Sequence, residues 1–153
     1  MVTLSRVLQK RLKRYNDMPR GQLIINNKDA FTEWGVSLSD GARSVLRSPA
    51  ALKQRVSNES RLAHGKTIIN TNLKKASREF SLEMHMISSS WADYLDKKAR
   101  WEAMLMGGVL NIKTSWEEGV TYRCLYLSCN PFAEYDGLAK FALRLEEPNP
   151  DNR

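Results

Sequence analysis

The clearest pattern along this chain is an alternation of apolar and polar side chains over residues 78–86. Successive side chains of a strand point to opposite faces of a sheet, so a period of two predicts a strand with one buried face. Residues 138–146 repeat the alternation and predict a second strand of this kind. The side chains expected to be buried in the two segments are Phe80, Leu82, Met84, Met86, Ala139, Phe141, Leu143 and Leu145.

The strongest helix signal covers residues 91–106, between these two strands. Ser90 is a typical N-cap, Asp93 follows it at the spacing of a capping box, and Gly107 supplies a stop. The pattern therefore predicts one amphipathic helix laid against the sheet. The side chains expected to face the sheet are Trp91, Leu95, Trp101 and Leu105.

Shorter apolar runs predict further strands. They lie at residues 22–25, 36–38, 109–113 and 120–129. The connections over residues 115–119 and 130–137 are short enough for antiparallel neighbours. We therefore predict a mainly β (α+β) fold, an antiparallel β-barrel or sandwich with one flanking α-helix at about residues 90–106.

The least regular part of the pattern covers residues 39–77. Weak strand candidates lie at residues 52–56 and 67–69, and Pro49 argues against a long helix there. Just before this segment, Asp29 is expected to cap a single helical turn that Gly35 closes.

The net charge of +7 is concentrated at the N-terminus. Residues 1–20 hold six basic side chains and one acid, a net of +5, whereas the other 133 residues carry only +2. We therefore divide the chain into a basic N-terminal arm (1–20), a single β domain (21–147) and a C-terminal tail (148–153). Folding of the domain is expected not to need the N-terminal arm. Such an arm either contacts phosphate or an acidic partner, or is simply solvated.

Composition excludes several classes of protein. The longest uncharged apolar runs are far shorter than the roughly 18 residues that a membrane-spanning helix needs, so no membrane partner is expected. Basic residues fill the positions where the apolar part of a secretory signal would lie, which predicts a chain that is cytoplasmic at synthesis. Cys124 and Cys129 are five residues apart in a predicted strand, too far to bridge each other, and are expected to be buried free thiols.

The sequence offers no recognisable catalytic motif, so we expect no enzyme, no catalytic residues, no cofactor and no metal site. The best fragment for chemistry is the His64-Gly65-Lys66 loop, with Ser60 and Arg61 before it, and a solvated loop is the preferred interpretation. His85 lies on the polar side of its strand without a nearby partner, which favours a surface or interface position.

Two pairs of acids, Glu117-Glu118 in a predicted turn and Glu146-Glu147 at a strand end, are expected to be solvated. The aromatic residues of the predicted helix recur at core spacing. Tyr122 and Tyr126 share one face of a strand and could form an exposed stacking platform. Together with the basic N-terminal arm, they keep a nucleic-acid-binding module as the alternative function.

Three stretches, together with the strand-helix-strand centre, carry a family resemblance over about residues 22–153. They are IINNKDAF running on to WGV at residues 24–36, SRLAHGK at residues 60–66, and FAL through EPNP at residues 141–150. These stretches resemble phage tail components of the distal-tail-protein type, in particular the short tail-like proteins of gut Bacteroidales prophages. Each is a turn or strand that shapes the fold, and none is a catalytic signature.

The resemblance implies a structural virion protein located in the phage tail. Its β-domain would associate with copies of itself into a ring, commonly sixfold in this family, that joins the tail tube to the baseplate or fibre machinery. Other tail proteins would be its partners, and the N-terminal arm would be available for non-specific DNA contact. Residues 52–69 are the candidate for the element that reaches a neighbouring subunit, because this stretch is long, polar and poorly committed to a local core.

Overall fold

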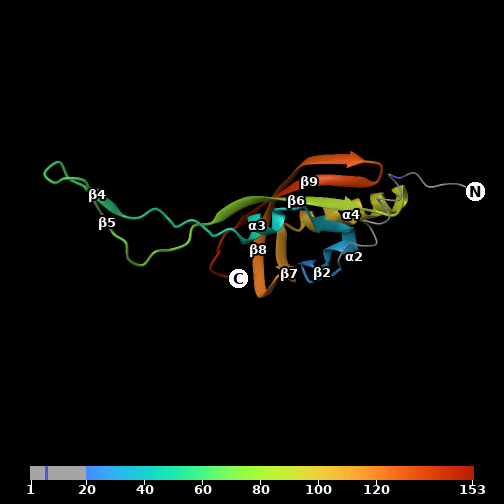
Figure 1. Ribbon diagram of the computed structural model, residues 1–153, viewed down its shortest axis with the longest axis horizontal. Helices are drawn as coiled ribbons and strands as arrows, with labels where there is room; N and C mark the ends of the chain where they lie inside the picture. The colour runs from blue at the N-terminus through green and yellow to red at the C-terminus, as the bar shows by residue number, and fades with distance from the viewer. Residues whose placement is uncertain (1–5, 7–19) are drawn as a thin grey trace, which may run out of the picture.

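The computed structural model describes residue 6 and residues 20–153, and strands dominate this part of the chain (Figure 1). One antiparallel sheet has the strand order β2-β1-β7-β8-β9-β6-β3 and curls into a half-barrel. Its strands are β1 (Leu23–Ile25), β2 (Lys28–Asp29), β3 (Val36–Leu38), β6 (Arg78–Ile87), β7 (Val109–Thr114), β8 (Glu117–Tyr135) and β9 (Leu138–Glu147). A separate hairpin pairs β4 (Ser57–Glu59) with β5 (Lys66–Ile68). The helices described are α2 (Ala30–Trp34), α3 (Ala42–Arg47) and α4 (Trp91–Met106).

The two alternating segments form strands, as predicted, and the two strands are neighbours in the sheet. Strands β6 and β9 pair antiparallel along their whole length, with Leu82 opposite Leu143 and Met84 opposite Phe141. These four side chains are at most 3% exposed. Cross-strand apolar pairs on one face therefore fix the register, because a slip by one residue would turn every one of them toward solvent.

Helix α4 covers the sheet at the predicted position and begins with the predicted cap. The Ser90 hydroxyl accepts a hydrogen bond from the Asp93 amide at 3.1 Å, and Asp93 in turn accepts one from the Ser89 amide. The predicted inner face is partly wrong, because Trp91 is 55% exposed and Leu95 47% exposed. The buried side chains are Tyr94, Lys97, Trp101 and Leu105.

The geometry of the helix explains this error. Tyr94, Trp101 and Leu105 return to the same side at intervals of seven and four residues, and Trp101 packs against Trp34 and Phe141. Leu95 lies roughly 100° around the helix from Tyr94, and Trp91 roughly 60° from it on the same side. Trp91 instead contacts the ring of Tyr94, with 5.3 Å between the centroids.

The connection predicted over residues 130–137 is wrong, because β8 runs on to Tyr135. Only Asp136 and Gly137 form the turn, both with positive φ (45° and 74°), as a tight two-residue hairpin requires. The register of β8 against β9 shifts between Cys129 and Phe132. This bulge accommodates Asn130-Pro131, a pair that is typical of loops, inside a strand.

The irregular segment was predicted least accurately. Helix α3 was not predicted, and the strand expected at residues 52–56 is wrong, since only Leu52 makes a bridge, to Lys75. The first strand of the hairpin is β4, which lies just after the predicted range. The second is β5, which begins one residue before the strand predicted at residues 67–69. These strands have no buried face, so apolar patterning could not locate them.

Gly35 holds the edge strand β3 in place. It ends α2 with a φ of 65°, and a Cβ at this position would lie 2.1 Å from the Ile87 carbonyl oxygen. The Ile87 amide donates to the Gly35 carbonyl at 2.9 Å, which starts the pairing of β3 with β6. Only glycine allows both the positive φ and this close approach.

None of the helices described is long and apolar enough to cross a membrane.

The burial of α4 gives a direct test of its orientation. Leu105→Ala should lower the free energy of unfolding by about 2–5 kcal/mol, because Leu105 is 2% exposed and its loss leaves a cavity. Leu95→Ala removes a half-exposed side chain and should cost less than about 1 kcal/mol. Urea unfolding of the two variants measures both values, and equal losses would contradict the orientation.

Candidate interaction site

A hairpin arm, defined here as residues 52–75, projects away from the body of the molecule (Figure 1). Every one of its residues is exposed. Pairing of β4 with β5 and the Leu52–Lys75 bridge hold its two sides together. Its exposed apolar side chains include Val56 (68%), Leu62 (98%) and Ile69 (51%). Exposed apolar side chains at several places along the arm suit a segment that packs on another molecule.

The charge of the hairpin arm differs in sign from that of the body. Residues 52–75 hold six basic side chains and one acid, a net charge of +5. Residues 21–51 and 76–153 together hold 12 basic and 15 acidic side chains, a net charge of −3. The arm of one molecule is therefore electrostatically complementary to the body of another.

A cluster of charged side chains lies at the root of the hairpin arm, the place where the chain leaves the body and returns to it. The Glu147 side chain is fully buried and accepts from Arg78 Nε at 3.1 Å. Arg153 binds the same carboxylate with two hydrogen bonds, of 2.9 and 2.8 Å. These bonds raise the pKa of Arg153. Two guanidinium groups, one buried and one partly exposed, thus satisfy one buried carboxylate, the arrangement that a buried charge requires.

Arg78 also connects the two sides of the arm's root. It stands at the start of β6, where the chain returns from the arm, and its Nη1 donates to the Ser48 carbonyl at 2.7 Å, where the chain leaves. A longer bond, of 3.3 Å, reaches the Val45 carbonyl. On the outside of the root, Lys75 pairs with Asp151 at 3.2 Å. The cluster therefore fixes the place where the arm leaves the body.

Tyr122 extends the cluster into the sheet. The Arg153 guanidinium lies 4.8 Å from the centre of its ring, and its hydroxyl donates to Glu117, which also pairs with Arg47. Burial, followed by the bond to Glu117, raises the pKa of Tyr122 to about 12. Tyr122 therefore stays protonated and donates its hydrogen bond throughout the physiological range.

The prediction that the acidic pairs are solvated holds for Glu118, which is exposed, but is wrong for Glu117 and Glu147. Glu147 is buried and the Glu117 side chain is only 19% exposed, because each pairs with an arginine far away in the sequence, Arg78 and Arg47 respectively. The prediction that Tyr122 and Tyr126 could form an exposed stacking platform is also wrong. Tyr122 is 1% exposed, and Tyr126 is partly buried against the core.

The two cysteines are free, as expected. Burial raises the pKa of Cys124 to about 12, the nearby Glu147 carboxylate adds to the rise, and Arg78 and Arg153 oppose it. Cys129 is half-buried, and burial raises its pKa as well. A thiol with a raised pKa is a poor nucleophile, so Cys124 acts as a small core side chain.

The sequence fragment with the best potential for chemistry lies at the tip of the hairpin arm. His64, Lys66, Ser60 and Arg61 are all exposed there. The Ser60 hydroxyl accepts from the Leu62 amide at 3.2 Å, which shapes the loop. Among residues 20–153, no group of three or more His, Cys, Asp or Glu side chains is placed to hold a metal ion.

His85 differs from its prediction. The sequence suggested a residue without a nearby partner, but the ring nitrogen Nε2 lies 2.9 Å from the Ser39 hydroxyl and the side chain is half-buried. Ser39 follows β3, and its amide donates to the Glu83 carbonyl at 2.9 Å. His85 therefore helps to fix the end of the edge strand.

Comparison with known proteins gives a fold but no sequence relative. No protein-family model matches the chain, and no curated protein matches it. Among solved structures, it is similar to the crystal structure of the Dit protein of phage SPP1, with a TM-score of 0.59 and 16% identity, over 86% of this chain and 50% of that one. The chain thus spans about half the length of Dit, which is described as a paradigm of the hub adsorption apparatus in phages that infect Gram-positive bacteria. At this identity the likeness establishes a shared fold, and it confirms the predicted fold of distal-tail type.

Removal of the buried carboxylate should destabilise the protein. Glu147→Ala leaves Arg78 buried without its partner, and we expect a loss of roughly 3–5 kcal/mol in the free energy of unfolding. The matched control is Glu79→Ala, which removes the carboxylate of an exposed pair with Arg144 and should cost at most about 1 kcal/mol. Urea unfolding measures both, and a Glu147→Ala loss no larger than that of the control would contradict the assigned role.

Proposed function

We propose that this chain is a structural, non-enzymatic subunit of a phage tail that assembles into a homo-oligomeric ring. The ring would join the tail tube to the baseplate or fibre machinery, so the protein would reside in the virion. The observation that carries this proposal is the fold, which is shared with a phage hub protein over 86% of the chain. The family resemblance of the sequence makes six the expected number of subunits.

The hairpin arm supports assembly between copies of the chain. It is exposed over its whole length and carries both apolar side chains and a net charge of +5, opposite in sign to the body. If each arm packs on the body of the next subunit, the contact is heterologous, because the two surfaces differ. Such a contact closes into a ring when its rotation permits, and every subunit then both gives and receives one arm.

The charged root gives the arm the definite direction that a closed ring needs. Arg78 joins the outgoing and returning chain through Ser48, and Lys75 pairs with Asp151 outside the root. An arm on a loose hinge would sample many directions and would lose more conformational entropy on packing. We therefore assign the buried cluster a supporting role in assembly.

The alternative function as a nucleic-acid-binding module has lost one of its two supports. Tyr122 is buried, so the aromatic platform is absent from its strand. The other support, the basic N-terminal arm, lies almost entirely outside the described residues. Non-specific DNA contact through that arm stays a prediction.

Charge reversal in the hairpin arm tests the proposal. The triple variant Arg55→Glu, Arg61→Glu and Lys66→Glu should remove oligomers that the unchanged chain forms when it is expressed with its neighbouring tail genes. The variant should still melt cooperatively, because these side chains contribute nothing to the core. Native mass spectrometry of the purified complexes gives the number of copies.

The matched control reverses three exposed basic residues of the body, Lys28, Lys113 and Lys140. It makes the same change in net charge and should keep the oligomer. Loss of the oligomer in the control but not in the arm variant would contradict the role of the arm. A chain that stays monomeric among its neighbouring tail proteins would contradict the ring itself.

A further inference from the structure

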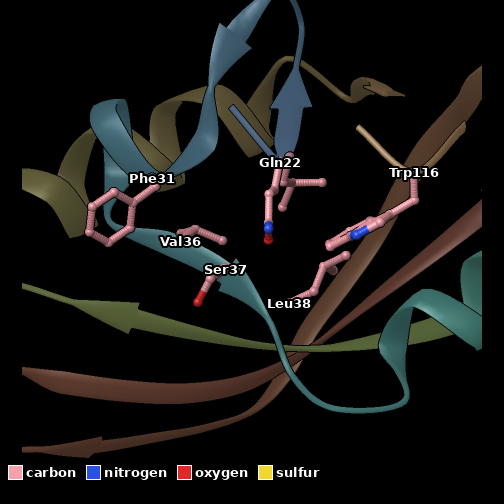
Figure 2. Close-up of a pocket in the computed structure, with 7 residues that line it drawn as sticks. Gln22, Phe31, Val36, Ser37, Leu38 and Trp116 are labelled. Atoms are coloured by element: carbon pink, nitrogen blue, oxygen red, sulfur yellow. The ribbon is translucent and has the colours of Figure 1, made fainter. Parts of the chain in front are cut away.

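The curled sheet does not close into a barrel, and its open seam contains a pocket (Figure 2). Strand β3 forms one edge of the sheet, and β2 with β1 forms the other. The pocket lies between the two edges and has a volume of about 110 Å³. Its lining residues are Gln22, Leu23, Phe31, Val36, Ser37, Leu38 and Trp116.

The backbone of β3 has hydrogen-bonding groups directed into this seam. Two main-chain hydrogen bonds to β6 flank Ser37. The Ser39 amide donates to the Glu83 carbonyl, and the Ile87 amide donates to the Gly35 carbonyl. In an antiparallel pair the residues that face the partner alternate with those that face away. The amide and carbonyl groups of Val36 and Leu38 therefore point away from β6, and no described strand pairs with them. Such an edge is a template for one more strand.

The side chains around the seam also fit an extended segment. Phe31 stands at one end of the pocket and Trp116 at the other, with β3 along its floor, and Gln22 points across toward β3 (Figure 2). A volume of about 110 Å³ accommodates roughly one aliphatic side chain. A strand added to β3 directs every second side chain to the same face, so one of them would fill the pocket.

Two guanidinium groups lie beside the seam and bear on the kind of partner. The Arg20 guanidinium lies 5.7 Å from the centre of the Phe31 ring, and that of Arg43 lies 4.9 Å from the centre of the Trp116 ring. The ion pairs found among residues 20–153 include neither guanidinium. Each end of the seam thus presents a cation on an aromatic face, which suits a carboxylate of a partner.

We infer that the seam binds an extended segment of another protein, which adds to β3 as a strand, places one aliphatic side chain in the pocket and carries acidic residues at both ends. Main-chain pairing would supply affinity, and the pocket with its two arginines would supply specificity. The occupant is not the hairpin arm of a second copy, because that arm has a net charge of +5 and would meet two further cations. The inference does not depend on the ring, since it concerns a separate surface.

A designed peptide tests this surface directly. The probe is a fluorescein-labelled hexapeptide of sequence Asp-Val-Thr-Val-Thr-Asp, blocked at both ends, and fluorescence polarisation with the full chain measures its binding. We expect saturable binding by about 1 mM protein, a weak affinity that suits a short strand. The same peptide with N-methyl groups on both valines and both threonines cannot donate main-chain hydrogen bonds from its four central residues and should bind at least about tenfold more weakly. A peptide with lysines in place of both aspartates should bind more weakly by a similar factor.

Protein variants complete the test. Arg20→Glu with Arg43→Glu should weaken the aspartate peptide by about tenfold or more and should restore binding of the lysine peptide. The control, Arg61→Glu with Lys66→Glu at the tip of the hairpin arm, makes the same charge change far from the seam and should leave both peptides unaffected (Figure 1). Circular dichroism would confirm that both variants are folded.

Several results would overturn the inference. They are an absence of binding of the aspartate peptide, equally tight binding of its N-methylated form, and equal effects of the two double variants on peptide binding. A loss of self-association in the seam variant would identify a second copy as the occupant, and this too would overturn the inference. None of these outcomes bears on assembly through the hairpin arm, which the arm variant tests separately.

Discussion

The fold depends on one buried carboxylate that is held by two arginines. Glu147 ends β9 directly opposite Arg78, the first residue of β6, so the register of β6 against β9 brings this ion pair together. A slip of one residue would leave two charges buried without partners as well as turning the apolar face outward. Arg153 then joins the C-terminal residues to the same carboxylate. The sheet register, the arm root and the chain end are thus linked through a single group.

This constraint explains how a small body can carry a long exposed arm. The arm makes no contribution to the core, since all of its residues are exposed, and its direction must be set where it leaves the body. Arg78 does this by binding Glu147 on one side and the Ser48 carbonyl on the other. The apolar core under α4 and the charged cluster therefore have separate tasks: the core stabilises the body, and the cluster orients the segment proposed to reach a neighbour.

Local patterns in the sequence predicted what depends on local periodicity. The alternation in β6 and β9 and the Ser90 cap of α4 are confirmed because one buried face, or one hydrogen bond, imposes each of them. The role of Glu147 could not be predicted, because its partner Arg78 is 69 positions away and the sequence shows only an acidic pair near the chain end. The strands of the hairpin arm were equally hidden, since neither face is buried in the chain itself.

Imaging of assembled tails is the most direct test of the proposed ring. Cryo-electron microscopy of particles from cells that express the surrounding gene cluster would show where this chain resides. We expect a closed ring of identical copies at the end of the tail tube, with each hairpin arm lying on the body of the next copy. Tails that lack the chain, or a chain recovered only as a monomer that turns over a substrate, would contradict this proposal.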